Sequence, residues 1–160
     1  MKYNRFEELP VWQAAIELAV GVFALTGKPC FRGHAGTRNQ LENAAVSVSN
    51  NIAEGFERGT TQELLTFIYI SRGSSGEVRS MLHLLDRLPE FTNLKFEISD
   101  LRSKAESISR QLRAWADSLQ NTEIRGTRYL TDKSCRIDQQ RRERDEFLKE
   151  LAEIRNRKAP

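Results

Sequence analysis

The sequence predicts an all-α fold, an up-and-down antiparallel four-helix bundle followed by a charged helical extension. Two observations lead to this prediction. Apolar residues recur every three or four positions in four long segments, which is the helical period. Prolines and clustered glycines separate those segments. Amphipathic helices joined by short connections bury their apolar stripes most simply in a bundle.

The first helix is expected over residues 9–26, with Pro10 in its first turn, where the missing N–H has no helical partner. Apolar side chains form two neighbouring rows on this segment. One row holds Trp12, Ile16, Ala19 and Phe23, and the other holds Val11, Ala15, Leu18, Val22 and Leu25. So wide an apolar face suggests burial against more than one neighbour.

The second helix is expected over about residues 38–57, after a loop at 27–36 that holds three glycines and one proline. The segment Thr37–Gln40 has the form of a capping box, in which Thr37 accepts a bond from a backbone N–H and Gln40 returns one. Apolar residues then continue at helical spacing, as far as Phe56.

The third helix begins after a second capping box, Thr60–Glu63, and ends before Pro89. Its expected core row is Leu64, Ile68, Ser71, Ser75, Val78, Leu82 and Leu85. Small residues occupy positions 71, 73, 74, 75 and 76 in the middle of this helix, where each glycine costs about 1 kcal/mol relative to alanine. A close approach by another helix would explain them.

The fourth helix, expected over about residues 93–120, has the most regular pattern. Its apolar residues follow one another at alternating intervals of four and three, which is typical of a bundle seam. They are Leu94, Ile98, Leu101, Ala105, Ile108, Leu112, Trp115 and Leu119. The predicted domains are therefore a bundle over 1–120 and a linker with a charged helical tail over 121–160.

The net positive charge of the chain lies in the tail. The whole sequence has 25 Lys+Arg and 22 Asp+Glu, a net charge of +3, whereas residues 1–120 hold 14 of each and are formally neutral. The tail includes the cluster Arg136, Arg141, Arg142 and Arg144, and its last helix has only the apolar residues Phe147, Leu148, Leu151 and Ile154. This tail is either a solvated charged helix or an extension that binds RNA or protein, and its apolar residues favour docking on a protein.

A cationic stripe is also expected on the third helix. Arg72, Gly76, Arg79, His83 and Arg87 recur at intervals of four, three, four and four. With a rise of 1.5 Å per residue, Arg72 and Arg79 lie about 10.5 Å apart along the axis, far enough to reach separate phosphates. The stripe is either a solvated face or a set of intersubunit ion pairs, or it contacts nucleic acid. Arg58, at the end of the second helix, is a further candidate contact.

Other function classes find little support. The histidines, His34 and His83, form no nucleophilic arrangement with serine and aspartate, so we expect no catalytic residue and no enzyme. Cys30 and Cys135 lack further ligands at metal-binding spacing, so neither a metal nor a cofactor is expected. The apolar stretch at 9–25 is interrupted by Gln13 and Glu17, and no signal-type leader precedes it. We therefore expect a cytoplasmic protein with free thiols and no membrane partner.

Three motifs in order carry a family resemblance. Residues 6–15 read FEELPVWQAA, residues 40–56 contain QL followed by NIAEGF, and residues 67–78 read FIYISRGSSGEV. Together they resemble the proteins encoded in intervening sequences of bacterial 23S ribosomal RNA genes, the S23-type family. This family is similar in fold to the accessory proteins of diversity-generating retroelements. The tail lies outside the resemblance.

The resemblance implies a four-helix bundle that assembles as a homopentamer, with a role in binding nucleic acid. In the retroelement relatives the bundle also binds a reverse transcriptase. The matching motifs include Asn51, Glu54, Gly55, Arg72 and Ser74, which either form a structural network that fixes helix pairing or belong to a ligand surface. A buried charge needs a partner, so we hypothesise that Glu54 pairs with Arg72 or Arg58.

Two functions follow as hypotheses. The first is a non-enzymatic, homo-oligomeric bundle that binds nucleic acid, most plausibly structured or ribosomal RNA, through basic surface residues. The alternative is an accessory subunit that binds protein within a reverse transcriptase or mobile-element complex, using the tail.

Overall fold

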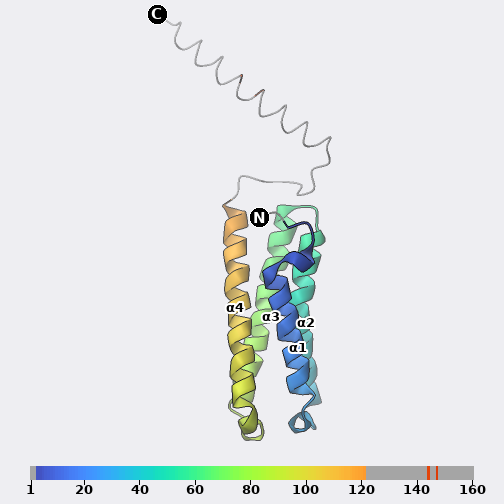
Figure 1. Ribbon diagram of the computed structural model, residues 1–160, viewed down its shortest axis with the longest axis vertical. Coiled ribbons are helices and arrows are strands. Elements are labelled where there is room, and N and C mark those ends of the chain that lie inside the picture. The colour runs from blue at the N-terminus through green and yellow to red at the C-terminus, as the bar shows by residue number, and fades with distance from the viewer. Residues whose placement is uncertain (1–2, 122–143, 145–146, 148–160) are drawn as a thin grey trace, which may run out of the picture. The chain divides into compact units, whose positions relative to one another are not determined.

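The computed structural model describes residues 3–121, 144 and 147, and places four helices side by side as an antiparallel bundle (Figure 1). The helices are α1 (Pro10–Thr26), α2 (Ala35–Glu57), α3 (Thr61–Leu85) and α4 (Lys95–Gln120). Three short 3-10 turns, η1 (Phe6–Glu8), η2 (Pro29–Phe31) and η3 (Pro89–Leu94), precede α1, α2 and α4. The described part of the chain has no strand, so the predicted all-α fold and the bundle are confirmed. Contacts divide the chain into units at 1–126 and 127–160, and all four helices belong to the first unit.

The core runs through the middle of the bundle and contains every residue of the row predicted on α3. Ile52, Leu64, Ile68, Ile98 and Ile108 are fully buried there. Two serines of the same α3 row are buried as well, and both are satisfied by backbone carbonyls of neighbouring helices. Ser71 Oγ donates to Val48 O of α2 at 2.8 Å, and Ser75 Oγ donates to Ala105 O of α4 at 2.7 Å. Their small side chains therefore bring α3 close to both of its neighbours, as predicted.

Close packing of helices explains one glycine of α2 but not the two glycines of α3. A Cβ atom placed on Gly55 would lie 2.6 Å from Phe67 Cβ, so α2 and α3 approach one another closely at this point. A Cβ atom on Gly73 or Gly76 would meet nothing within 4 Å. Helix packing within the bundle thus accounts for Gly55 but not for Gly73 or Gly76, which corrects part of the prediction for the small residues.

The two predicted capping boxes have different outcomes. Thr60 is the N-cap of α3, and its Oγ1 accepts the backbone N–H of Glu63 at 3.2 Å. Thr37 caps nothing, because α2 begins at Ala35 and has His34 at its N-cap position, without a side-chain bond. Gly33 provides the turn that permits this earlier start, since its φ of +92° strains any other residue.

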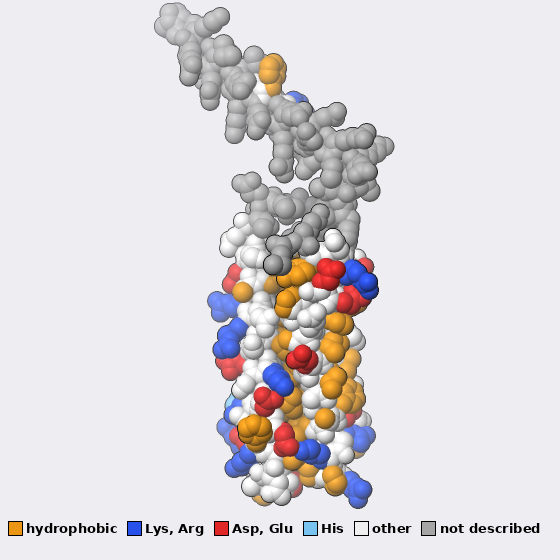
Figure 2. Space-filling view, viewed as in Figure 1, with side chains coloured by type: hydrophobic (Ala, Val, Ile, Leu, Met, Phe, Trp, Pro, Cys, Tyr) orange, Lys and Arg blue, Asp and Glu red, His pale blue; other side chains and the backbone are white. Residues whose placement is uncertain are grey.

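The wide apolar face of α1 is only half covered within the bundle. The row that begins at Val11 is buried throughout. In the row that begins at Trp12, Ile16 is 36% exposed and Phe23 is 49% exposed. Val20, next to this row, is 64% exposed. Figure 2 shows hydrophobic side chains along this edge of the bundle, where α1 lies in Figure 1. α1 nevertheless packs against both α2 and α4, so the burial against more than one neighbour that the sequence suggested is present, and these exposed apolar side chains lie outside it.

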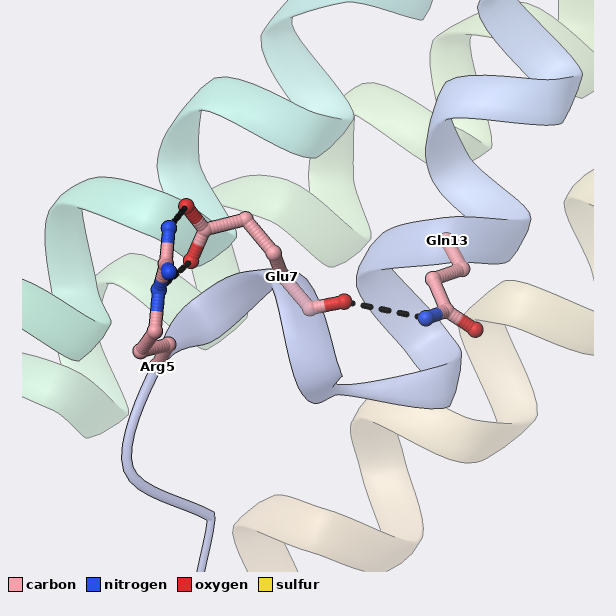
Figure 3. Close-up of polar contacts among 3 residues, drawn as sticks. All are labelled: Arg5, Glu7 and Gln13. Atoms are coloured by element: carbon pink, nitrogen blue, oxygen red, sulfur yellow. Dashed lines mark hydrogen bonds and ion pairs between the residues drawn. The ribbon is translucent and has the colours of Figure 1, made fainter.

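The N-terminal turn is fastened to α1 by polar and aromatic contacts. Gln13 Nε2 of α1 donates to Glu7 O at 3.0 Å, and Arg5 Nη2 donates to Glu7 Oε1 at 2.7 Å (Figure 3). The hydrogen bond from Arg5 lowers the pKa of the Glu7 carboxyl. The rings of Phe6 and Trp12 meet edge to face, with their centroids 5.2 Å apart.

Candidate nucleic-acid interface

Arg72, Arg79 and His83 of the predicted cationic stripe lie on α3, whereas Arg87 lies in the turn that follows the end of this helix at Leu85. Arg72 and Arg79 are half-buried, and His83 and Arg87 are exposed. The position of the stripe follows from the core row: a residue one position after a buried residue is rotated by about 100° around the helix, to the border between core and solvent. Arg72 and Arg79 each occupy such a position, after Ser71 and Val78.

Ion pairing separates these arginines from most other cations of the bundle. Eight cations between residues 3 and 121 form ion pairs with carboxylates: Arg5, Lys28, Arg38, Arg58, Arg102, Lys104, Arg110 and Arg113. Five cations in the same range form none: Arg32, Arg72, Arg79, Arg87 and Lys95. All three arginines of the stripe are in the second set, so their charges remain available to a ligand.

Arg79 is the most constrained of the three. Its Nε atom is buried and has no hydrogen-bond partner in the described structure. A buried donor without an acceptor costs about 1–3 kcal/mol.

His83 is linked to α4 at the far end of the stripe. Arg102 Nη1 lies 3.3 Å from His83 Nδ1 and 3.4 Å from Asp86 Oδ2. The guanidinium can only donate, so Nδ1 acts as the acceptor in this contact. Arg102 therefore bridges His83 and Asp86 beside the stripe, with both contacts longer than the 2.7–2.9 Å typical of charge-assisted bonds.

The pairing hypothesis for Glu54 holds in one of its two forms. Glu54 Oε1 accepts from Arg58 Nη2 at 2.6 Å, one helical turn further along α2. This hydrogen bond raises the pKa of the Arg58 guanidinium. The same guanidinium lies 5.2 Å from the centre of the Phe67 ring. Arg72 takes no part in this pair, so the Glu54–Arg72 contact is not formed.

Asn51 and Ser74 belong to a hydrogen-bond network between α2 and α3. Asn51 Nδ2 donates to both the carbonyl oxygen and the hydroxyl of Ser47, at 2.7 and 2.9 Å. The hydroxyls of Ser47 and Ser74 lie 2.9 Å apart. A structural network therefore exists at these motif positions, although it does not include the charged residues Glu54 and Arg72.

A groove of about 550 Å³ lies between α2 and α3, next to this network. Its lining is Gln40, Asn43, Ala44 and Ser47 of α2 with Glu77, Ser80 and Met81 of α3. The sequence reasoning missed this site. A signal was present, because Gln40 and Asn43, and likewise Glu77 and Ser80, are polar residues three positions apart and so share a helix face.

The tail candidates lie almost entirely outside the described residues. Arg136, Arg141 and Arg142 belong to the part that the structure does not describe, and Arg144 is helical and exposed. Phe147 is 59% exposed.

Among the described residues no three metal-ligating side chains come together. None of the described helices has the length and apolarity that a membrane span requires.

Comparison with known protein families identifies a match. The sequence model of the family described as 23S rRNA-intervening sequence protein matches residues 7–114. These residues run from η1 to α4 and include the stripe and the groove. No curated protein matches the chain.

Proposed function

The chain belongs to the 23S rRNA-intervening sequence protein family, and from this premise we propose that it is a non-enzymatic, homo-oligomeric bundle that binds RNA through the α3 stripe. The observation that carries the proposal is the absence of ion pairs at Arg72, Arg79 and Arg87 among the described residues. Five cations between residues 3 and 121 have no carboxylate partner, and three of the five are these arginines. The family description supports RNA, and ribosomal RNA in particular, as the ligand.

The spacing of the stripe suits a polyanion better than a single small anion. Arg72 and Arg79 are seven residues apart on α3, which places their Cα atoms about 10 Å apart along the helix axis, and Arg87 follows in the turn after the helix. A phosphate backbone presents charges at regular intervals over such lengths. Contacts of this kind fix the position of an RNA without reading its sequence.

Salt dependence is the direct test of this function. The full chain is titrated with a structured 23S rRNA fragment at several salt concentrations, and the logarithm of the affinity should fall by about 0.7–0.9 for each phosphate that is neutralised, per tenfold rise in salt. Arg72→Gln and Arg79→Gln should each reduce this slope by about one phosphate. Arg110→Gln is the matched control, because Arg110 is an exposed cation on α4 that is already paired with Glu106. Undetectable binding at about 50 mM salt contradicts the proposal.

Self-association uses the uncovered face of α1. Ile16, Val20 and Phe23 form an exposed apolar stripe there, and burying each in a subunit interface removes apolar area worth about 25 cal/mol per Å² from water. The resemblance indicates five subunits. Light scattering on the wild type and on Val20→Asp should give a large assembly and a smaller species. Phe96→Asp is the control, since Phe96 is 85% exposed on α4. A monomeric wild type at micromolar concentration contradicts the oligomer.

A second function, capture of a protein such as a reverse transcriptase, rests on the tail. The apolar residues Phe147, Leu148, Leu151 and Ile154 in the tail sequence support it, and Phe147, the one of them that the structure describes, is exposed. Removal of residues 121–160 should abolish binding of such a partner and leave RNA binding by the bundle intact. Loss of RNA binding on truncation would instead assign the tail arginines to the RNA interface.

A further inference from the structure

We propose that the α2–α3 groove receives one unpaired guanine base of the RNA whose backbone lies on the α3 stripe. This inference rests on the proposed function and adds a base-reading site to it. The groove volume of about 550 Å³ is within the range of about 300–1,000 Å³ that small-ligand sites have, and is sufficient for a nucleotide.

The lining has the chemistry that reads base edges. It offers one carboxylate, amides and hydroxyls, and it has no cation, so it is unsuited to phosphate. Gln40, Asn43, Glu77 and Ser80 make no side-chain hydrogen bond or ion pair with the other described residues. The end of the groove at Ser47 is fixed by its bonds to Asn51 and Ser74. These unbonded polar side chains, beside a serine that is held by hydrogen bonds, can form selective hydrogen bonds with a ligand.

Glu77 determines which base fits. A carboxylate only accepts hydrogen bonds, and its two oxygens match a pair of adjacent N–H donors. The Watson–Crick edge of guanine presents such a pair, on N1 and N2, whereas adenine, cytosine and uracil each present one donor group on that edge. Single-stranded RNA is read in this way, by splaying out a base and bonding its edge.

Glycines connect the stripe to the groove. Each residue of α3 is rotated by about 100° from the previous one, which places Gly73, Gly76 and Ser80 between the arginines and Glu77 around the helix. From Gly73 to Ser80 the ridge between the two sites is therefore made of small side chains, with the exposed Tyr69 and Leu84 one turn beyond either end, and a Cβ atom on either glycine would meet nothing within 4 Å. Glycine permits close approach of a ligand backbone. An RNA strand with a phosphate on Arg79 can thus turn a base over Gly76 into the groove.

The test compares short single-stranded RNAs on the full chain by fluorescence anisotropy. The probes are a heptamer of uridine and the same heptamer with guanosine, adenosine or cytidine at its centre. A bidentate contact gives roughly tenfold discrimination, so the guanosine heptamer should bind about ten times more tightly than the other three. Glu77→Gln should remove this preference and leave the uridine heptamer bound as before. Glu17→Gln is its control, because Glu17 is an exposed, unpaired glutamate among the described residues of α1.

A larger side chain on the ridge between the stripe and the groove gives a second variant, which we expect to fold. Gly76→Leu adds a good helix former where the structure has open space, so its thermal stability should match or exceed that of the wild type. It should reduce the guanosine preference to below twofold. Gly36→Leu, in the first turn of α2, is the matched control, since a Cβ there also meets nothing.

Each other outcome overturns the inference in a distinguishable way. If the wild type binds all four heptamers equally, the groove reads no base and the backbone function survives. If no RNA binds at low salt, the proposed function fails and the inference fails with it. If Gly76→Leu retains the guanosine preference but reduces the size of the oligomer, the groove is a contact between copies of the chain.

Discussion

Alanine substitution at three helical glycines tests the packing of the bundle, because the structure predicts a different effect at each. The variants are Gly55→Ala, Gly21→Ala and Gly76→Ala, made one at a time. Alanine is favoured over glycine inside a helix by about 1 kcal/mol, so this gain is common to all three variants. What differs is the space for the added methyl group.

The magnitudes follow from what each Cβ would meet. At Gly76 nothing lies within 4 Å, so the variant should keep the full gain of about 1 kcal/mol. At Gly21 the methyl group would lie 2.6 Å from Leu101 Cδ2, the end of a flexible side chain that can turn away, and we expect almost no net change. At Gly55 the contact is with Phe67 Cβ, also at 2.6 Å, which cannot move without its helix. Overpacking costs about 1–3 kcal/mol, so Gly55→Ala should be destabilising by up to about 2 kcal/mol.

Urea denaturation followed by circular dichroism gives the free energy of unfolding of each variant. The expected order of stability is Gly76→Ala, then Gly21→Ala and the wild type, then Gly55→Ala. If Gly55→Ala is stabilised as much as Gly76→Ala, then α2 and α3 do not approach as closely as described. The reasoning fails equally if Gly76→Ala is destabilising, because another molecule must then cover that position.

Three further predictions concern polar groups. Thr60→Ala removes the side-chain acceptor for the Glu63 N–H and should lower the free energy of unfolding by about 1 kcal/mol, whereas Thr37→Ala, which removes no cap, should change it by less than about half of that. Glu54→Gln breaks an exposed ion pair with Arg58 and should alter the melting temperature by no more than about 2 °C, since such pairs contribute little; a loss of several degrees would mean that Glu54 has a buried partner. Because Arg5 lowers the pKa of Glu7 in the folded chain, this carboxylate stabilises the fold above its unfolded pKa and loses that effect as the pH falls through its folded pKa. Carboxyl titration by NMR should show the Glu7 pKa returning to the ordinary range in Arg5→Gln, and an unchanged pKa would contradict the contact.

Helical periodicity and capping patterns predicted the parts of the fold that depend on residues close together in the sequence. The core row of α3 is one such part, because a helix with apolar and serine residues at three- and four-residue spacing has only one face to bury. The cap at Thr60 is another, since donor and acceptor are three residues apart. The predicted start of α2 was wrong. Phe31 and His34, just before the helix, both pack on Phe91, and their ring centroids lie 4.8 and 5.4 Å from that of Phe91. That contact comes from η3, far along the chain, so the local pattern at residues 37–40 could not indicate it.

The candidate site was less predictable for a related reason. The spacing of Arg72, Arg79 and Arg87 was visible in the sequence, but whether carboxylates neutralise them depends on which helix lies alongside. Arg102 meets Asp86 only because α4 returns antiparallel to α3. The groove has residues from two helices, so neither segment alone indicates it. Glu54 illustrates the opposite case, because its partner Arg58 lies one turn away and was among the two expected.

The net charge of the bundle says little about its capacity to bind RNA. Residues 1–120 hold 14 cations and 14 anions, which on a count alone argues against a polyanionic ligand. Ion pairing is uneven, however: α4 pairs Arg102, Lys104, Arg110 and Arg113, all within its own turns or with Asp86. Arg72 and Arg79 of α3, and Arg87 just after this helix, are left with no carboxylate partner among the described residues. An approaching phosphate experiences the local field, which is screened beyond about 10 Å at moderate salt, so a neutral domain can present a cationic surface.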